Sequence, residues 1–246
     1  AMGGRPLWMT LALTLRDADE QWLHFFATGL HQVASDHGVA LVGGDTTRGD
    51  TTVVSVQLTG TVDHGCAILR SGAQAGDTIY VSGNVGDAAG GLALREHPPA
   101  ESLGPHQYLF ERLEYPTPRV ALGQAINDRA TAAIDISDGL LADLGHVVTA
   151  SNCGATLWVD RLPLSPLLTA QVPSAQVLIS QLGGGDDYEL CFCVEPTKVA
   201  ALQALARDCA LAVTEVGVIE PQPGVRCRHD DGSGYQPGVC GFDHFA

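Results

Sequence analysis

A short apolar strand that leads straight into an amphipathic helix constrains this sequence more than any other feature. Residues 132–136 have the apolar character of a strand. Residues 138–151 place Leu140, Leu141, Leu144, Val147 and Val148 on one side of a helix. A helix with such a stripe packs against the sheet, which fixes its first residues in space. We therefore expect a rigid strand-to-helix connection within a mixed αβ fold.

Two carboxylates lie in this connection, in the sequence Asp135-Ile136-Ser137-Asp138-Gly139. Asp138 is expected at the helix N-terminus, where a carboxylate caps the backbone and interacts favourably with the helix dipole. Asp135 has no such structural reason, and both are expected at the carboxyl edge of the sheet, where αβ proteins bind ligands. Two carboxylates in one crevice repel each other unless a cation lies between them. The connection therefore predicts a magnesium site, since magnesium accepts a few carboxylates and fills its shell with water and phosphate oxygens.

The hydrophobic pattern elsewhere predicts further elements on both sides of a change in composition at residues 63–76. Before it, we expect a strand at 6–15, a helix at 17–37, and strands at 39–42 and 51–62 with a turn at 43–45 between them. After it, we expect strands at 78–81, 155–159, 189–194 and 213–219, and helices at 83–95, after 119, and at 196–208. The pattern predicts two domains, 1–66 and 67–246.

Charge and composition exclude several classes of protein. With 28 acidic and 13 basic residues, the formal charge of −15 repels a nucleic-acid backbone, so we expect no nucleic-acid partner. No apolar run approaches the roughly 20 residues of a membrane span, and nothing resembles a secretion signal, so we expect no membrane partner and a cytoplasmic location. The seven cysteines form no CxxC pair, so we expect buried thiols and no structural metal.

Two other motifs combine glycine with acidic residues: Gly43-Gly44-Asp45-Thr46-Thr47, and Gly183 to Glu189 with the sequence GGGDDYE. Each alone is more often a turn than a site. The glycines at 83, 86, 90 and 91 do not fit the GxGxxG dinucleotide fingerprint, although a glycine-lined turn could still bind an anion through its backbone N–H groups. No Walker GxxxxGK[ST] motif is present. A GxSxG nucleophile elbow is also absent, and no spacing of His, Cys and Asp suggests a triad, which disfavours covalent hydrolytic catalysis.

Taken together, these motifs resemble the thiamine-monophosphate kinase family, in the superfamily that also holds aminoimidazole ribonucleotide synthetase and selenophosphate synthetase. The resemblance covers nearly the whole chain, through the segments 2–8, 42–47, 81–87, 118–123, 135–140, 185–192 and 241–245. The strings Asp-Ile-Ser-Asp-Gly-Leu and Asp-Tyr-Glu-Leu-Cys-Phe together are far more specific than either motif alone.

The resemblance implies an α+β (mixed α/β) fold with a two-domain, aminoimidazole ribonucleotide synthetase-like architecture. The first domain would pair with its twin in a homodimer, and the second would fold over the ATP site. It also implies magnesium, ATP as phosphoryl donor and thiamine monophosphate as acceptor. The implied site residues are Asp45, Asp135 and Asp138 as metal ligands, Gly44, Asp45, Arg70 and Ser137 around the nucleotide, and Glu189 and Phe242 on the thiamine side.

The chemistry of a phosphate acceptor agrees with this residue set. An acceptor oxygen that is already anionic near neutral pH needs no strong general base, but it needs charge neutralisation and alignment. Members of the family begin with a further stretch of about half a domain that carries more acidic ligands. That stretch is not in these 246 residues, so we expect an incomplete first domain and little or no activity from this chain alone.

Two alternatives remain open at this point. The chain could be another ATP-dependent synthetase of the same superfamily, or a catalytically incomplete fragment that only binds a ligand or dimerises. Measuring ATP turnover with and without thiamine monophosphate would distinguish them.

Overall fold

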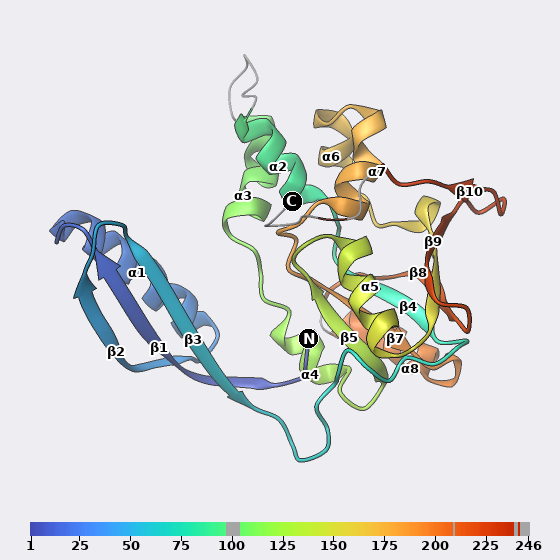
Figure 1. Ribbon diagram of the computed structural model, residues 1–246, viewed down its shortest axis with the longest axis horizontal. Helices are drawn as coiled ribbons and strands as arrows, with labels where there is room; N and C mark the ends of the chain where they lie inside the picture. The colour runs from blue at the N-terminus through green and yellow to red at the C-terminus, as the bar shows by residue number, and fades with distance from the viewer. Residues whose placement is uncertain (97–103, 209, 239–240, 242–246) are drawn as a thin grey trace. The chain divides into compact units, whose positions relative to one another are not determined.

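The computed structural model describes residues 1–96, 104–208, 210–238 and 241 (Figure 1). The chain divides into a smaller unit, Gly4–Gly65, and a larger unit that combines Ala1–Gly3 with Cys66–Ala246. The first three residues thus belong to the larger unit, which the sequence pattern did not indicate.

A three-stranded sheet with one helix forms the smaller unit. The central strand β1 (Arg5–Leu15) pairs in parallel with β2 (Ala40–Arg48) and antiparallel with β3 (Val53–Thr61). Helix α1 (Glu20–Asp36) connects β1 to β2, and Asp19 caps it by accepting hydrogen bonds from the first backbone N–H groups. Alternate residues of β1, among them Met9 and Leu13, are buried together with Ala34 of α1. This packing holds α1 on one face of the sheet.

The expected turn at Gly43-Gly44-Asp45 is wrong, because β2 runs through these residues to Arg48. Gly44 lies opposite Leu11 of β1 with φ of +150°, and a Cβ atom there would lie 1.8 Å from the Leu11 carbonyl oxygen. A close approach of two backbones therefore requires this glycine. By strand alternation, Asp45 lies on the sheet face opposite Met9 and Leu13.

Seven strands form the sheet of the larger unit, in the order β10-β9-β6-β8-β4-β7-β5. They are β4 (Thr78–Ser82), β5 (Ala130–Ile136), β6 (Gly154–Trp158), β7 (Glu189–Val194), β8 (Val213–Glu220), β9 (Gly224–Arg228) and β10 (Gly234–Tyr235). Every pairing is antiparallel except that of β6 with β9. The edge strand β5 therefore ends beside the start of β7, which brings Ile136 opposite Glu189.

Both faces of this sheet are covered by helices. Helix α5 (Leu140–Ala150) packs on one face, where Leu144 and Val147 join the buried residues of β4, β5 and β7. Leu122 and Ile126, from α4 (Val120–Ala125) and the residue after it, and Leu202 of α8 (Val199–Asp208) pack on the other face around Phe192.

A smaller apolar cluster of the larger unit joins four more helices. These are α2 (Asp87–Glu96), α3 (Gln107–Glu114), α6 (Pro166–Gln171) and α7 (Ser174–Gly183). Leu109 and Leu168 are fully buried in this cluster. Short 3₁₀ turns at Gly104–His106, Val159–Arg161 and Pro196–Lys198 complete the described elements.

The expected cap of helix α5 is also wrong. The helix begins at Leu140, and its N-cap residue is Gly139, which contributes no side-chain hydrogen bond. Asp138 thus lies before the cap, and its carboxylate is not used to hold the helix. Within the described ranges, no helix is long and apolar enough to cross a bilayer.

Candidate functional site

The residues Asp135 to Asp138, here called the acidic loop, leave the end of β5 and lead into α5. The side chains of Asp135, Ser137 and Asp138 are all partly exposed. Within the described residues, the carboxylates of Asp135 and Asp138 accept no hydrogen bond and form no salt bridge. Both carboxylates are therefore left with their acceptor capacity for a ligand.

A third carboxylate, that of Asp143 in the first turn of α5, binds the backbone of the acidic loop. Its side chain is 2% exposed, and its Oδ2 atom accepts hydrogen bonds from the backbone N–H groups of Ser137 at 2.9 Å and Asp138 at 3.1 Å. Burial raises the pKa of Asp143, and the nearby charges of Asp138 and Asp135 add to this rise, while the two hydrogen bonds act against it. This role of Asp143 was not predicted from the sequence, although an acid in the first turn of a helix is a recognisable signal.

The residues that lead into β7, the strand next to β5, form hydrogen bonds to the acidic loop. We call residues Gly185 to Glu189 the GDDYE segment. Its Asp186 N–H donates to the Ser137 carbonyl at 2.9 Å, and its Tyr188 N–H donates to the Ile136 carbonyl at 2.8 Å. Asp186 and Tyr188 both have positive φ, at 65° and 48°. The sequence therefore places two non-glycine residues in an unfavourable backbone region where the two motifs meet.

The two remaining acids of the GDDYE segment are completely buried. Asp187 accepts hydrogen bonds from the N–H groups of Gly86 at 2.7 Å and Ala88 at 3.4 Å, and burial raises its pKa to about 7. The glycine-lined turn before α2 thus already binds a carboxylate of the protein itself through these N–H groups. An external anion would have to displace Asp187 to use these two donors.

Glu189 pairs with two arginines in the interior. Its carboxylate accepts hydrogen bonds from Ser82 Oγ at 2.6 Å, Arg112 Nη2 at 3.0 Å and Arg119 Nε at 2.7 Å. The fit is so close that a Cβ atom on Gly83 would lie 2.3 Å from its Oε1 atom. The role of Glu189 on the thiamine side stays a prediction, because these protein donors occupy its carboxylate in the structure.

The other predicted site residues lie at the far end of α5, in the smaller unit or outside the described residues. The exposed Arg70 has its backbone carbonyl bonded to Ser151 Oγ, which lies at the C-terminal end of α5, whereas the acidic loop lies at the N-terminal end. Gly44 and Asp45 belong to the smaller unit. Phe242 is outside the described residues.

The donor set of the acidic loop fits magnesium bound by few protein ligands. Among the described residues, no group of three or more His, Cys, Asp or Glu side chains is arranged to hold a metal ion. Asp135 and Asp138 offer carboxylate oxygens, which hard divalent cations prefer. Such an ion would take the rest of its shell from water and phosphate oxygens.

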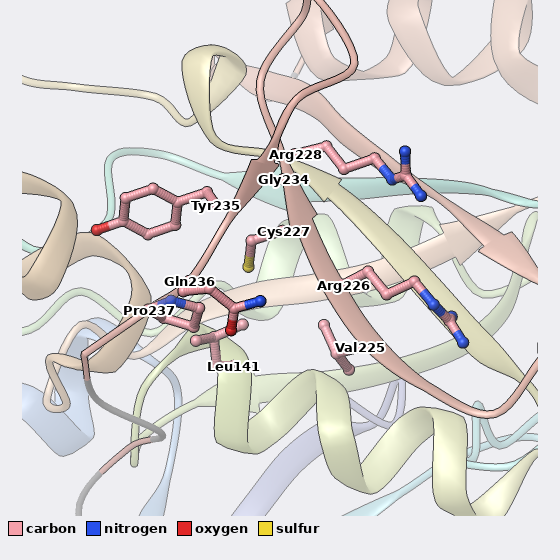
Figure 2. Close-up of a pocket in the computed structure, with 9 residues that line it drawn as sticks. All are labelled: Leu141, Val225, Arg226, Cys227, Arg228, Gly234, Tyr235, Gln236 and Pro237. Atoms are coloured by element: carbon pink, nitrogen blue, oxygen red, sulfur yellow. The ribbon is translucent and has the colours of Figure 1, made fainter.

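A separate pocket of about 470 Å³ lies beside the first turn of α5 (Figure 2). Leu141 lines it from the helix, and Val225, Cys227, Tyr235 and Gln236 line it from β9, β10 and the following residue. In Figure 2 the guanidinium groups of two further lining residues, Arg226 and Arg228, extend away from Leu141. None of the predicted site residues lines this pocket.

Two family models match most of the chain. Residues 1–62 match the family model of the AIR synthase related protein, N-terminal domain, and residues 74–230 match that of the C-terminal domain. Solved structures of the hydrogenase maturation protein HypE from E. coli share the fold, one with a TM-score of 0.81 at 18% identity over 100% of this chain and 77% of that one. The chain is therefore a member of the AIR synthase-related class.

Closer relatives give the particular family. The chain is 42% identical to thiamine-monophosphate kinase of Escherichia coli (strain K12), over its whole length and 76% of that protein. It is similar to the crystal structure of thiamine-monophosphate kinase from Stenotrophomonas maltophilia K279a, at 44% identity and a TM-score of 0.88, over 96% of this chain and 75% of that one. A structure of AaThiL complexed with AMPPCP and TMP matches 99% of this chain and 75% of that one, at 29% identity and a TM-score of 0.86. This chain belongs to the thiamine-monophosphate kinase family.

The position of Asp143 generates a prediction about the acidic loop. Asp143→Leu removes the acceptor of two backbone N–H groups, which is expected to lower the free energy of unfolding by about 1–3 kcal/mol. The same variant is expected to weaken magnesium-dependent nucleotide binding, because Asp135 and Asp138 lose their fixed positions. Asp143→Asn keeps an oxygen acceptor and serves as the matched control, with smaller losses in both properties. Urea unfolding and calorimetric titration measure the two quantities, and equal behaviour of both variants would contradict the role assigned to Asp143.

Proposed function

We propose that this protein transfers the terminal phosphoryl group of ATP to thiamine monophosphate, giving thiamine diphosphate. Family membership supports this activity, since the relatives that match the full chain are thiamine-monophosphate kinases. Further support comes from AaThiL, which has been solved with AMPPCP, an analogue of ATP, and with TMP.

The acidic side chains in and around the acidic loop fall into two groups, and this division is the main support for the proposal. Asp143, Asp187 and Glu189 are buried, and protein donors satisfy them. Asp135 and Asp138 are partly exposed, and no protein donor in the described residues satisfies them. A pair of unsatisfied carboxylates favours a bound cation, and ATP and a phosphate acceptor are substrates that arrive with cations.

Within this proposal, Asp135 and Asp138 bind magnesium, and Ser137 contacts the nucleotide between them. Bound magnesium neutralises the charge of the phosphate groups and aligns them. The protein contributes fixed positions, because Asp143 and the GDDYE segment hold both sides of the acidic loop. Asp45 as a further metal ligand, Gly44 and Arg70 as nucleotide contacts, and Glu189 and Phe242 on the thiamine side belong to the same proposal.

The acceptor explains why this site needs no strong base. The phosphate of thiamine monophosphate presents an oxygen that is anionic near neutral pH, whereas free thiamine presents a neutral alcohol. Partly exposed Asp residues that bind a cation do not perform the deprotonation that an alcohol requires.

We also propose that the protein self-associates through its smaller unit and acts in the cytoplasm. The sheet of this unit has a helix on one face only, and β2 and β3 are edge strands within the described residues. Unpaired edges are templates for pairing with another chain, and the uncovered face carries Trp8, which is 43% exposed. The cytoplasmic location fits the free thiols of the described cysteines.

An acceptor panel tests the proposed reaction. The natural protein is expected to form thiamine diphosphate from ATP, magnesium and thiamine monophosphate, and to leave free thiamine and aminoimidazole-type substrates unchanged. Chromatography of the products measures both. ATP turnover that is independent of thiamine monophosphate would point to another synthetase reaction, and no turnover with any acceptor would favour a binding role.

Sedimentation velocity tests self-association. The wild-type protein is expected to sediment as a dimer, and Trp8→Glu is expected to shift it toward the monomer by placing a charge on the uncovered sheet face. Phe25→Glu is the control, because Phe25 is 65% exposed on α1. A wild-type monomer at all concentrations, or equal shifts in both variants, would refute the assignment.

A further inference from the structure

Tyr188 combines two properties that the fold alone does not require. Its side chain is 41% exposed, although the residues on either side, Asp187 and Glu189, are completely buried. Its φ of 48° is unfavourable for a bulky side chain, so the surrounding hydrogen bonds hold it in a strained conformation. Strain of this kind is characteristic of functional sites, where it fixes the direction of a side chain.

The position of Tyr188 ties it to the acidic loop. Its backbone N–H donates to the Ile136 carbonyl, one residue beyond Asp135. Its hydroxyl group donates a hydrogen bond of 3.2 Å to Oδ1 of the exposed Asp186. Burial raises the pKa of Tyr188, and the charges of Asp186, Asp135 and Asp138 add to this rise, so the exposed side chain lies near the two carboxylates assigned to magnesium. A third carboxylate, that of Asp186, is bound to the Tyr188 hydroxyl group.

This surrounding suits an aromatic cation. A tyrosine face attracts positive charge through the ring quadrupole, and donating a hydrogen bond to a carboxylate increases the electron density of the ring. The proposed acceptor carries such a charge, because its thiazolium ring is permanently cationic. A short two-carbon arm joins this ring to the phosphate. When the phosphate of the acceptor binds at the acidic loop, the thiazolium ring therefore comes close to Tyr188.

We propose that Tyr188 binds the thiazolium ring of thiamine monophosphate on its exposed face, and that Asp186 orients the tyrosine ring. This inference rests on the proposed function and deepens it by assigning the residue that recognises the positive charge of the acceptor. Tyr188 then contributes to acceptor specificity and takes no part in nucleotide binding. Adenine stacking on the same ring is the competing role, and it predicts the opposite dependence on the two substrates.

The test compares two acceptor ligands on variants of the natural protein. One ligand is thiamine monophosphate, and the other is its neutral analogue in which a thiophene ring replaces thiazolium. Tyr188→Asn removes the ring and tolerates positive φ, which protects the fold. Tyr188→Phe and Tyr188→Trp retain an aromatic face. Tyr115→Leu, which removes another exposed tyrosine, is the matched control.

Calorimetry of each ligand, with thermal unfolding to confirm the fold, measures the effect. Tyr188→Asn is expected to weaken binding of thiamine monophosphate by about 3- to 30-fold, the range of a cation–π contact, with little change for the neutral analogue or ATP. The Phe variant should bind only slightly more weakly than wild type, the Trp variant at least as tightly, and Tyr115→Leu without change.

Three results would overturn the inference. Equal weakening for both acceptor ligands would mean that Tyr188 contributes only contact area, and weakening for ATP alone would identify an adenine platform. Unchanged affinity for thiamine monophosphate in a folded Tyr188→Asn variant would exclude any contact. Failure of the proposed function itself is distinguishable, since the wild-type protein would then not bind thiamine monophosphate at all.

Discussion

The two backbone hydrogen bonds between the GDDYE segment and the acidic loop are the interaction on which the site depends. They join the end of β5 to the start of β7, two strands that are neighbours in the sheet but far apart in the sequence. Because Asp186 and Tyr188 donate to carbonyl groups on either side of the β5 terminus, the acidic loop cannot turn without breaking both bonds. The strain of positive φ at these two residues is retained because both ends of the segment are anchored.

Those anchors are the two buried acids of the same segment. Asp187 accepts hydrogen bonds from the N–H groups of Gly86 and Ala88 at the start of helix α2. Glu189 holds Arg112 of α3 and Arg119 at the start of α4. A buried carboxylate is costly unless it is hydrogen-bonded or paired, and a buried pair is strongly destabilised when one partner is removed. Five consecutive residues thus connect three helices to one loop. The segment acts as the support of the site and also presents one exposed aromatic ring to it.

The sequence predicted the parts of this arrangement that follow from periodicity. The strand 132–136, the strand 189–194 and the helix over Leu144 and Val147 were predicted near their observed bounds. The two strands are short, almost continuous apolar runs, and the helix repeats its apolar residues at helical spacing. The turn at Gly44 was wrong, because glycine there serves the close approach of β1 and does not break the strand. Glycine has both uses, and only the pairing of strands decides between them.

The support of the site could not be predicted in the same way. Asp143, Asp187 and Glu189 look like Asp135 and Asp138 in a sequence, since all are acids near glycine or a helix start. What separates them is burial and the identity of their donors, such as Arg112, which lies 77 positions before Glu189. Helices α3, α6 and α7 were missed as well, because they are short. Helix α3 packs mainly on α2, and α7 packs on α5 and α2. The family resemblance predicted that the acidic loop belongs to the site. The structure adds the hydrogen bonds that hold this loop in place.

In the proposed function, the unsatisfied carboxylates of Asp135 and Asp138 bind the catalytic cation. Anomalous diffraction from crystals of the natural protein soaked in Mn²⁺ and a non-hydrolysable ATP analogue tests it most directly, because manganese prefers the same oxygen ligands as magnesium. An anomalous peak within coordination distance of both carboxylates is expected in the wild-type protein, and its loss is expected in Asp135→Asn and Asp138→Asn variants that keep the same fold. A peak that contacts neither carboxylate, or one that persists in both variants, would rule out this cation site.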